Sequence, residues 1–505
     1  MAKIEVYYSY IKINNYSEGD CPKLENYFRL YDEIRHISYY NHIIFDSNNK
    51  VLYIPRGVDV FLIEQLLNAR AVYITRPDEY FLNTPIRMKY EPRDDKQVTT
   101  LKFITGTDEF HNYKNASQYM VTLAPGKGKT YIAVAYFAIT GLKPMVCSYN
   151  LSDQWRERIK EYSDIKDREI YTIQGADSIR YLLSKSREEL NNRYKVYLAT
   201  HGTISSLFNT AGMEAVRNLF IHLGIGVKVI DEAHKNFENT CKIDYSSNTL
   251  KTIYLTASPA RGDERENRIF GLYFKNVPKI DLFGEEDKHT QYIALRYSSN
   301  PTLFEMNSCM TNRGFSRTNY ANYIVTKPNF YYMLHIIFDL ISRFDGKKLF
   351  YVSSNEAITA IYNYIHNDMT LRHYWGKVGI YTSINPNKMS ALDCEIILTT
   401  SQSAGEGRDI PGLICAVNLS DPTKSEPLVI QKFGRIRMNG FFIDLIDEGF
   451  RTLNKYYYAN LKLYNKYAVS SNDIYYNQQK MMDGFNKFKQ KNAITIDELF
   501  VKREA

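Results

Sequence analysis

Residues 119–141 constrain the fold most strongly, because they place a glycine-rich loop between an apolar strand and a helix. The run YMVT at residues 119–122 predicts a buried strand, and YIAVAYFAITG at residues 131–141 predicts a helix. The loop between them, residues 123–130, has the sequence LAPGKGKT. This context is typical of a phosphate-binding P-loop, in which backbone N–H groups and the helix N-terminus face the phosphates.

Each residue of this loop has a role if the loop binds a nucleotide. Lys129 reaches the β and γ phosphates as a point charge, and the hydroxyl of Thr130 is a ligand for Mg²⁺. Leu123 stands where the pattern GxxxxGK[ST] has its first glycine, so the match is incomplete. The alternative is a glycine-rich turn followed by a chance Lys-Thr pair. The loop predicts ATP and Mg²⁺ as cofactors, and its expected nucleotide-binding residues are Pro125, Gly126, Lys127, Gly128, Lys129 and Thr130.

A second motif, Asp231-Glu232-Ala233-His234, follows the apolar run VKVI at residues 227–230. We expect Asp231 to hold Mg²⁺, directly or through water. Glu232 is then the candidate general base for the attacking water. The alternative is a strand end followed by an acidic helix cap, because acidic residues favour helix N-termini.

A third motif, QKFGRIR, lies late in the chain at residues 431–437. Arg435 and Arg437 are candidate arginine fingers for the charge that develops on a γ phosphate, and Gln431 begins the motif. Taken alone, the motif favours a basic helix N-terminus at the surface, but together with the first two motifs it favours arginine fingers.

The N-terminal region, residues 1–90, predicts a small α+β domain. Residues 4–13 are rich in β-branched and aromatic side chains and predict one strand. Residues 24–34 predict a helix, residues 42–57 a hairpin, and residues 58–68 a second helix.

The rest of the chain repeats an alternation of apolar strands, polar turns and helices. This pattern is typical of parallel sheets with helices on both faces. We therefore expect an α/β fold with two tandem parallel-sheet domains, at residues 91–287 and 288–465. A helical tail is expected at residues 466–505.

Composition excludes some classes of protein. The net charge of +8 and the pI of about 8.8 exclude a strongly basic packaging protein but permit a polyanionic partner. The six cysteines form no CxxC pair and no cluster with zinc spacing, so we expect a reduced, intracellular chain without structural metal. The N-terminus lacks a signal-peptide pattern and no run of about 18 apolar residues occurs, so no membrane segment is expected. The 43 tyrosines fit a biased genome or, alternatively, a surface on which bases stack.

The three motifs and their neighbours resemble those of superfamily 2 helicases and translocases, which have two RecA-like domains. The further matching segments run in the family's order along the chain: SYNLSDQW at 148–155, ATHGT at 199–203, TASP at 256–259, LFYVSSNEA at 349–357 and TTSQSAGEGRDIP at 399–411. The resemblance implies that ATP binds between the two RecA-like domains and that single-stranded nucleic acid crosses both.

The resemblance also implies individual roles. Gln97 matches the glutamine that reads adenine, and Gly407 and Asp409 match nucleotide-binding positions of the second domain. The expected nucleic-acid contacts are Ser148, Gln154, Thr200, His201, Ser353 and Thr400.

Three positions depart from the family pattern. Cys147-Ser148 replaces Pro-Thr, and Ser258 replaces a threonine but keeps a hydroxyl. The pattern QxxGRxxR requires arginine at position 438, which is Met438 here. Arg437 comes one residue early, a rotation of about 100° on a helix, so Arg435 is the stronger candidate finger.

Residues 35–67 resemble the N-terminal module of phage branch-migration helicases of the T4 and T5 type. The resemblance implies structure-selective, sequence-independent action on branched or forked DNA in the cytoplasm of a bacterial host. The alternative for this region is an unrelated small α+β domain.

The sequence therefore predicts an ATP-dependent DNA helicase or translocase that remodels branched DNA in replication, recombination or repair. An RNA helicase, the motor subunit of a restriction-like complex and a nucleotide switch without motor activity remain alternatives. Residues 310–323 are either a wedge at a fork or a solvated loop.

Overall fold

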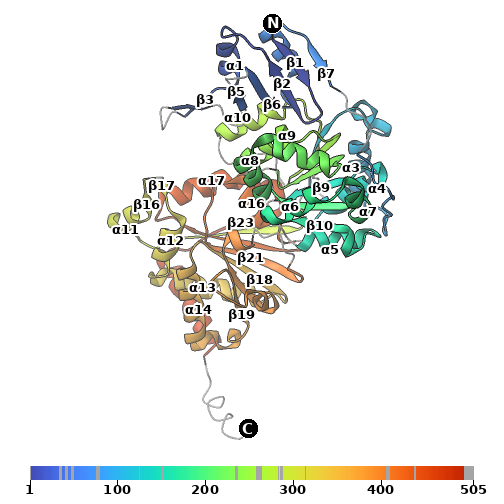
Figure 1. The fold of residues 1–505 in the computed structure, drawn as a ribbon. Helices are drawn as coiled ribbons and strands as arrows, with labels where there is room; N and C mark the ends of the chain where they lie inside the picture. The colour runs from blue at the N-terminus through green and yellow to red at the C-terminus, as the bar shows by residue number, and fades with distance from the viewer. Residues whose placement is uncertain are drawn as a thin grey trace. The chain divides into compact units, whose positions relative to one another are not determined.

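The computed structural model forms two compact units, Met1–Phe283 and Gly284–Ala505. The described residues are 2–32, 37–39, 44–46, 50–74, 80–123, 126–148, 153–233, 237–256, 264–282, 284, 288–312, 314–404, 410–436 and 439–493. Figure 1 shows a small sheet and a large sheet in the first unit and one large sheet in the second.

The small sheet of the first unit has the strand order β5-β6-β2-β1-β7. Its strands are β1 (Lys3–Val6), β2 (Tyr10–Asn14), β5 (Ile44–Asp46), β6 (Val51–Pro55) and β7 (Ala71–Tyr73). All its pairs are antiparallel except β1 with β7. The helices are α1 (Cys21–Phe28) and α2 (Val60–Leu67), and a separate pair is formed by β3 (Leu30–Asp32) and β4 (Ile37–Tyr39).

Two expectations for this region need correction. Residues 4–13 form two strands, because the chain turns at residues 7–9 and the Tyr7 N–H donates to the Tyr10 carbonyl at 2.9 Å. The first helix ends at Phe28, and residues 30–32 are strand β3. The hairpin over residues 42–57 is confirmed by the pairing of β5 with β6.

The small sheet packs on helix α9 (Phe237–Ser246) and on the end of α10 (Glu264–Tyr273), which belong to the same unit as the large sheet. Their buried side chains form one continuous core. A Cβ on Gly57 would lie 2.4 Å from the Tyr273 carbonyl oxygen, so the backbones are nearly in contact. The Tyr8 N–H also donates to Asn248 Oδ1 at 3.0 Å, and Lys275 pairs with Asp59 at 2.8 Å. Residues 2–74 are therefore part of a larger folded unit.

The large sheet of the first unit has the strand order β10-β11-β9-β12-β13-β8-β14, and every pair is parallel. Its strands are β8 (Gln118–Thr122), β9 (Pro144–Ser148), β10 (Ile170–Ile173), β11 (Val196–Thr200), β12 (Val227–Asp231), β13 (Lys251–Thr256) and β14 (Lys279–Asp281). Its helices are α3 (Asp95–Thr105), α4 (Lys129–Thr140), α5 (Asp153–Tyr162), α6 (Gly175–Ser184), α7 (Arg187–Arg193), α8 (His201–His222), α9 (Phe237–Ser246) and α10 (Glu264–Tyr273).

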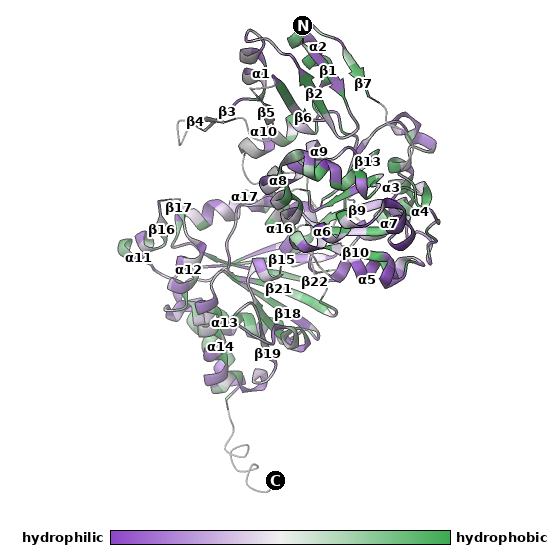
Figure 2. Cartoon of the chain, viewed as in Figure 1, coloured by the Kyte–Doolittle hydropathy of each residue, from purple (hydrophilic) through white to green (hydrophobic). Residues whose placement is uncertain are grey.

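Hydrophobic cores lie on both faces of this sheet, which explains why its strands are continuously apolar. Figure 2 shows hydrophilic residues over α5 and α7, beside the hydrophobic strands. Of the described helices, none combines the length and apolarity that a bilayer crossing requires.

The second unit repeats this architecture. Its sheet has the parallel order β19-β20-β18-β21-β22-β15-β23. The strands are β15 (Thr290–Tyr297), β18 (Lys347–Val352), β19 (Val378–Tyr381), β20 (Ile396–Thr399), β21 (Leu413–Ser420), β22 (Gly440–Asp447) and β23 (Ala468–Tyr475). The helices are α11 (Leu303–Ser308), α12 (Arg317–Ile324), α13 (Pro328–Ile341), α14 (Asn355–Asn367), α15 (Ser401–Ala404), α16 (Glu426–Phe433), α17 (Arg451–Tyr467) and α18 (Gln478–Lys491).

The two parallel sheets and the small α+β sheet confirm the expected fold class. The expected helical tail differs from the structure, because among its described residues β23 adds an edge strand to the sheet before helix α18 begins. Residues 310–323 form a short hairpin of β16 (Met310–Thr311) and β17 (Gly314–Phe315), followed by the start of α12.

Candidate nucleotide and nucleic-acid sites

The described part of the glycine-rich loop contains two glycines with left-handed backbone conformations. Gly126 and Gly128 have φ angles of +81° and +89°, which glycine adopts without steric cost. Helix α4 begins at the next residue, Lys129, so its free N–H groups face the loop. The Lys129 ammonium donates to the Leu123 carbonyl at 3.2 Å and thus lies back over the loop. Pro125 lies outside the described residues.

Gln97 lies against this loop, although it is distant in the sequence. A Cβ on Gly128 would lie 2.2 Å from Gln97 Nε2. The Gln97 side chain is almost fully buried, and its Oε1 accepts from the Arg93 N–H at 2.8 Å. Asp94 caps helix α3 by accepting from the Gln97 N–H at 2.9 Å. The structure thus holds this glutamine against the loop, and its role in reading adenine stays a prediction.

The acidic pair lies at the end of β12. Asp231 Oδ2 accepts from the indole N–H of Trp155 at 2.9 Å, and Oδ1 accepts from the Glu232 N–H at 3.0 Å. Burial and the Glu232 charge raise the pKa of Asp231, while Lys129 acts in the opposite direction. Lys129 of the loop therefore lies close enough to Asp231 for their charges to interact.

Glu232 has a φ angle of +53°, a left-handed conformation that is uncommon for a residue with a side chain. Such a conformation costs about 1–3 kcal/mol and persists where the surrounding structure imposes it. It turns the chain sharply at the sheet edge. His234 lies outside the described residues.

These groups fit a Mg²⁺–nucleotide. The loop supplies backbone donors and an ammonium for phosphate oxygens. A hydroxyl on the first turn of α4, Thr130, and the carboxylate of Asp231 are oxygen ligands of the kind that Mg²⁺ prefers. Hydrolysis chemistry with a metal-bound nucleotide is therefore compatible with this sheet edge.

One expected nucleic-acid contact needs correction. The His201 side chain is only 1% exposed, and its Nε2 lies 3.0 Å from the Cys147 carbonyl oxygen. Burial lowers the pKa of His201 to about 4, so the ring is neutral at physiological pH. The histidine therefore joins α8 to β9 inside the protein and does not lie at a surface where nucleic acid could bind.

The other three candidates of the first unit lie at the carboxyl edge of its sheet. Ser148 ends β9 and is buried, and Gln154 lies half-buried on α5. Thr200 caps α8, because its hydroxyl accepts from the Thr203 N–H at 2.9 Å. The segment TASP begins at Thr256, the last residue of β13, and its next three residues lie outside the described ones.

The second unit brings two expected nucleic-acid contacts into one pocket. Ser353 follows β18, and Thr400 follows β20, the neighbouring strand. Both line a pocket with a volume of about 470 Å³, together with the cations Arg317 and Lys388. Hydroxyl groups and cations are the side chains that bind a phosphate backbone.

Asp421 joins the elements around this pocket. It accepts from the hydroxyl groups of Ser353, at 2.9 Å, and of Ser401. It also pairs with Lys432 of α16 at 2.9 Å and with Arg317 of α12 at 3.1 Å. Burial opposes its ionisation, but the charges of Lys432 and Arg317 overcome this and lower the pKa of Asp421 to about 2.

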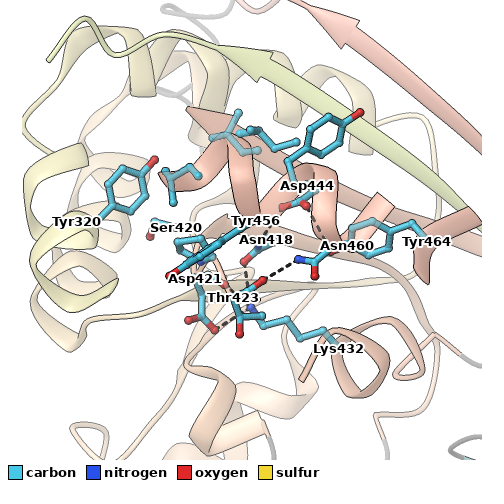
Figure 3. Close-up of a pocket in the computed structure, with 15 residues that line it drawn as sticks. Tyr320, Asn418, Ser420, Asp421, Thr423, Lys432, Asp444, Tyr456, Asn460 and Tyr464 are labelled. Carbon is cyan, nitrogen blue, oxygen red and sulfur yellow. Dashed lines mark hydrogen bonds and ion pairs between the residues drawn. The ribbon is translucent and has the colours of Figure 1, made fainter. Parts of the chain in front are cut away.

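A second polar network continues from Asp421 into the interior (Figure 3). The Lys432 ammonium also donates to Asn418 Oδ1 at 3.2 Å, and Asn418 donates to Asp444 Oδ1 at 2.8 Å. Tyr464 lies beside Asp444 in the same cavity, whose volume is about 30 Å³. The network fixes α16, the helix that precedes Arg435, on the sheet.

The third motif is only partly described. Gln431 lies partly buried on α16, and Arg435 donates to the Ala404 carbonyl at the end of α15. Gly407, Asp409 and Arg437 lie outside the described residues. The finger role of Arg435 stays a prediction.

Sequence patterns did not indicate three of the connecting residues. Trp155 and Lys432 lie inside motifs and Asp421 lies between two of them, but no spacing rule predicts a contact between residues that are far apart in the chain. For Trp155, the signal was its place next to Gln154 in the segment SYNLSDQW.

We predict that Gly128→Ala lowers nucleotide affinity by roughly 10-fold or more, about 1.4 kcal/mol. The new Cβ would displace Gln97 and would also strain a backbone with φ +89°. Fluorescent nucleotide titration measures the effect. Gly141→Ala is the matched control, because Gly141 has φ +66° at the other end of α4 and its Cβ would meet only Phe81, at 3.8 Å. Equal affinity in both variants would contradict the proposed site.

We predict that Asp421→Asn destabilises the second unit by about 3–5 kcal/mol at pH 7, because the buried Lys432 ammonium loses its counter-charge. The Asp421 pKa is about 2, below its ordinary value, so its contribution is complete above about pH 4 and lost as the pH falls towards 2. Urea unfolding at pH 7 and pH 3 measures both effects. Exposed Asp483→Asn is the control. The free energies of unfolding of Asp421→Asn and the natural protein are compared at both pH values. If they differ by the same amount at pH 7 and pH 3, the low pKa of Asp421 is contradicted.

Known proteins are similar to this chain mainly in the region of the first large sheet. Residues 88–261 match the ResIII family, described as type III restriction enzyme, res subunit. A putative DNA 3'-5' helicase Rad25 from Haloarcula marismortui is 28% identical over 150 residues, which are 29% of this chain and 21% of that protein. Its counterpart from Halobacterium salinarum is 26% identical over 167 residues, 33% of this chain and 24% of that protein. The chain thus spans a quarter or less of the length of these relatives.

Among solved structures, the ATP-dependent Type ISP restriction-modification enzyme LlaBIII bound to DNA matches with a TM-score of 0.51 and 13% identity. The match covers 80% of this chain and 33% of that chain, and it shows a shared fold. T4 UvsW matches over 94% of this chain and 99% of that chain, with 13% identity and a TM-score of 0.36. The family match lies on the sheet that carries the glycine-rich loop and the acidic pair, and the second unit repeats the parallel-sheet architecture of the first.

Proposed function

We propose that this protein is an ATP-dependent DNA helicase or translocase that remodels branched DNA. One observation carries the ATPase part of the proposal. The loop after β8 and the acidic pair after β12 meet at the same sheet edge, where Lys129 and Asp231 interact electrostatically.

Each residue at this sheet edge has a separate role in ATP hydrolysis. Lys129 and the loop N–H groups bind the β and γ phosphates and stabilise the charge that moves onto them. Thr130 and Asp231 hold the Mg²⁺ that accompanies ATP. Glu232 orients the attacking water and accepts its proton.

The pocket around Ser353 and Thr400 supports a nucleic-acid partner. Its hydroxyl groups, together with Arg317 and Lys388, suit phosphate oxygens and carry no information about base sequence. We therefore expect sequence-independent binding that weakens as salt increases, because binding releases counterions from the phosphate backbone.

The N-terminal region supports a branched substrate. Its sheet shares a core with the first RecA-like domain, so any DNA that it binds would be held rigidly relative to the ATP-binding loop. With the resemblance of residues 35–67, this favours action at junctions or forks, in the cytoplasm of a bacterial host.

A second candidate function is the motor of a restriction-like complex. The ResIII match and the fold shared with the LlaBIII enzyme favour it. Such a motor moves along intact duplex DNA, whereas a branch-migration enzyme needs a junction.

We predict that Lys129→Ala and Glu232→Gln each reduce DNA-stimulated ATP hydrolysis by at least about 100-fold, the usual effect of removing a charge-stabilising donor or a general base. Release of phosphate is measured with and without single-stranded DNA. Glu188→Gln, an exposed residue on α7, is the control and is expected to leave turnover unchanged. Turnover retained in either active-site variant would refute the ATPase assignment.

We predict that ATP drives conversion of a synthetic four-way junction to its arms faster than it separates a tailed duplex of the same strand length. Gel assays compare a four-way junction, a fork, and 5'- and 3'-tailed duplexes, with RNA versions of the tailed strands. Displacement of a triplex-forming strand from intact duplex, without action on the junction, would favour the restriction motor. A preference for RNA would favour an RNA helicase.

A further inference from the structure

Trp155 of α5 contacts Asp231, which is 76 residues away in the sequence. Its indole Nε1 donates to Asp231 Oδ2 at 2.9 Å. An indole has one donor and no acceptor, so this hydrogen bond uses its entire polar capacity. The contact joins the helix that carries Gln154 to the carboxylate at the end of β12.

The indole cannot easily turn away from Asp231. Trp155 is 5% exposed and packs in the same apolar core as Ile159, the next residue on that face of α5. A buried aromatic side chain of this size has a fixed orientation, because neighbouring side chains fill the space around it. The direction of its N–H is therefore set by the position of α5.

We infer that Trp155 is a positioning residue that orients Asp231 towards the metal and transmits the position of α5 to the nucleotide site. The inference rests on the proposed function, because it takes Asp231 as the ligand of the Mg²⁺ that accompanies ATP. It goes beyond that function because it assigns Trp155 as the side chain that connects nucleic acid bound at Gln154 with the binding of the nucleotide.

The physical basis is the geometry of a carboxylate. Asp231 Oδ2 gives one lone pair to the indole N–H, and Oδ1 gives one to the Glu232 N–H. These two hydrogen bonds fix the plane of the Asp231 carboxylate, and with it the direction in which its remaining lone pairs can bind a metal ion. Partners that orient a metal ligand in this way typically contribute about 10–100-fold to metal affinity or activity. A small shift of α5 changes the direction, and by linkage the metal–nucleotide and the nucleic acid affect each other's binding equally.

Trp155→Phe tests the inference, because it keeps an aromatic ring in the core and removes only the donor and part of the volume. The measurement is the binding of a fluorescent ADP analogue to the full chain as Mg²⁺ is titrated. We expect the Mg²⁺ concentration for half-maximal binding to rise by about 10-fold. Binding of the analogue in EDTA is expected to stay the same.

Two control variants separate the hydrogen bond from packing. Ile159→Val removes volume from the same core without touching the donor. Trp375→Phe is the same substitution at a tryptophan whose indole donates to the Ile365 carbonyl in the second unit. Both are expected to keep the natural Mg²⁺ dependence. A shift in Ile159→Val as large as that in Trp155→Phe would overturn the inference.

A second measurement tests the link to nucleic acid. Single-stranded DNA is expected to lower the half-maximal Mg²⁺ concentration in the natural protein and in Ile159→Val, but not in Trp155→Phe. An equal effect of DNA in all three proteins would overturn the transmission through Trp155.

Fluorescence supplies a readout that is independent of binding curves. The chain has two tryptophans, so Trp155 is the only one left in a Trp375→Phe background. Its emission is expected to change when Mg²⁺ and ADP are added together, and not when Asp231 is replaced in Asp231→Asn. A change that persists in Asp231→Asn would contradict the inference.

The outcomes distinguish the inference from the proposed function. Loss of Mg²⁺ dependence in Asp231→Asn, with natural behaviour in Trp155→Phe, would refute only the role of Trp155. Unchanged Mg²⁺ dependence in both variants would refute Asp231 as the metal ligand and, with it, the proposed nucleotide site.

Discussion

The parallel arrangement of both large sheets is the constraint on which the candidate sites depend. In a parallel sheet the carboxyl ends of all strands lie at one edge, so residues that follow different strands meet there. In the first unit the glycine-rich loop follows β8 and Asp231 ends β12, with β13 between these strands. In the second unit Ser353 follows β18 and Asp421 follows β21, its neighbour. Residues far apart in the sequence are thus collected without any long loop, because each lies within a few residues of a buried strand.

The same core packing explains two features that composition alone left open. The small N-terminal sheet shares its core with the first RecA-like domain, and the near contact at Gly57 leaves no room for a side chain between them. Tyrosine dominates the largest fully buried side chains, including Tyr119, Tyr254 and Tyr292. These rings fill the interior, and Tyr254 donates to buried Asp244 at 2.7 Å. Many tyrosines of this chain therefore serve as core residues with a hydrogen-bonding end, and do not form an exposed surface on which bases stack.

Local patterns predicted the parts of the site that local chemistry determines. The strand–loop–helix context indicated the conformation of Gly126 and Gly128, because only glycine adopts these φ angles freely. The apolar run before Asp231 likewise indicated its place at a strand end. Contacts between distant elements have no such signature. The burial of His201 depends on Cys147 of a neighbouring strand, and β23 forms only because the edge of β15 is available to pair with it. The centre of this segment, residues 470–473, is Ser-Ser-Asn-Asp, so propensity did not distinguish strand from helix there.

In each unit one carboxylate links an element expected to touch nucleic acid with an element expected to touch nucleotide. Asp231 accepts from Trp155, the neighbour of Gln154, and its charge interacts with Lys129 of the loop. Asp421 accepts from the Ser353 hydroxyl and pairs with Lys432, on the helix that leads to Arg435. A carboxylate suits this task because its two oxygens accept several hydrogen bonds, and because leaving any buried partner unpaired is costly. Movement of one element therefore strains the hydrogen bonds of the others. Coupling between binding and hydrolysis needs such two-way connections, which hydrogen bonds and ion pairs provide together with the packed side chains around them.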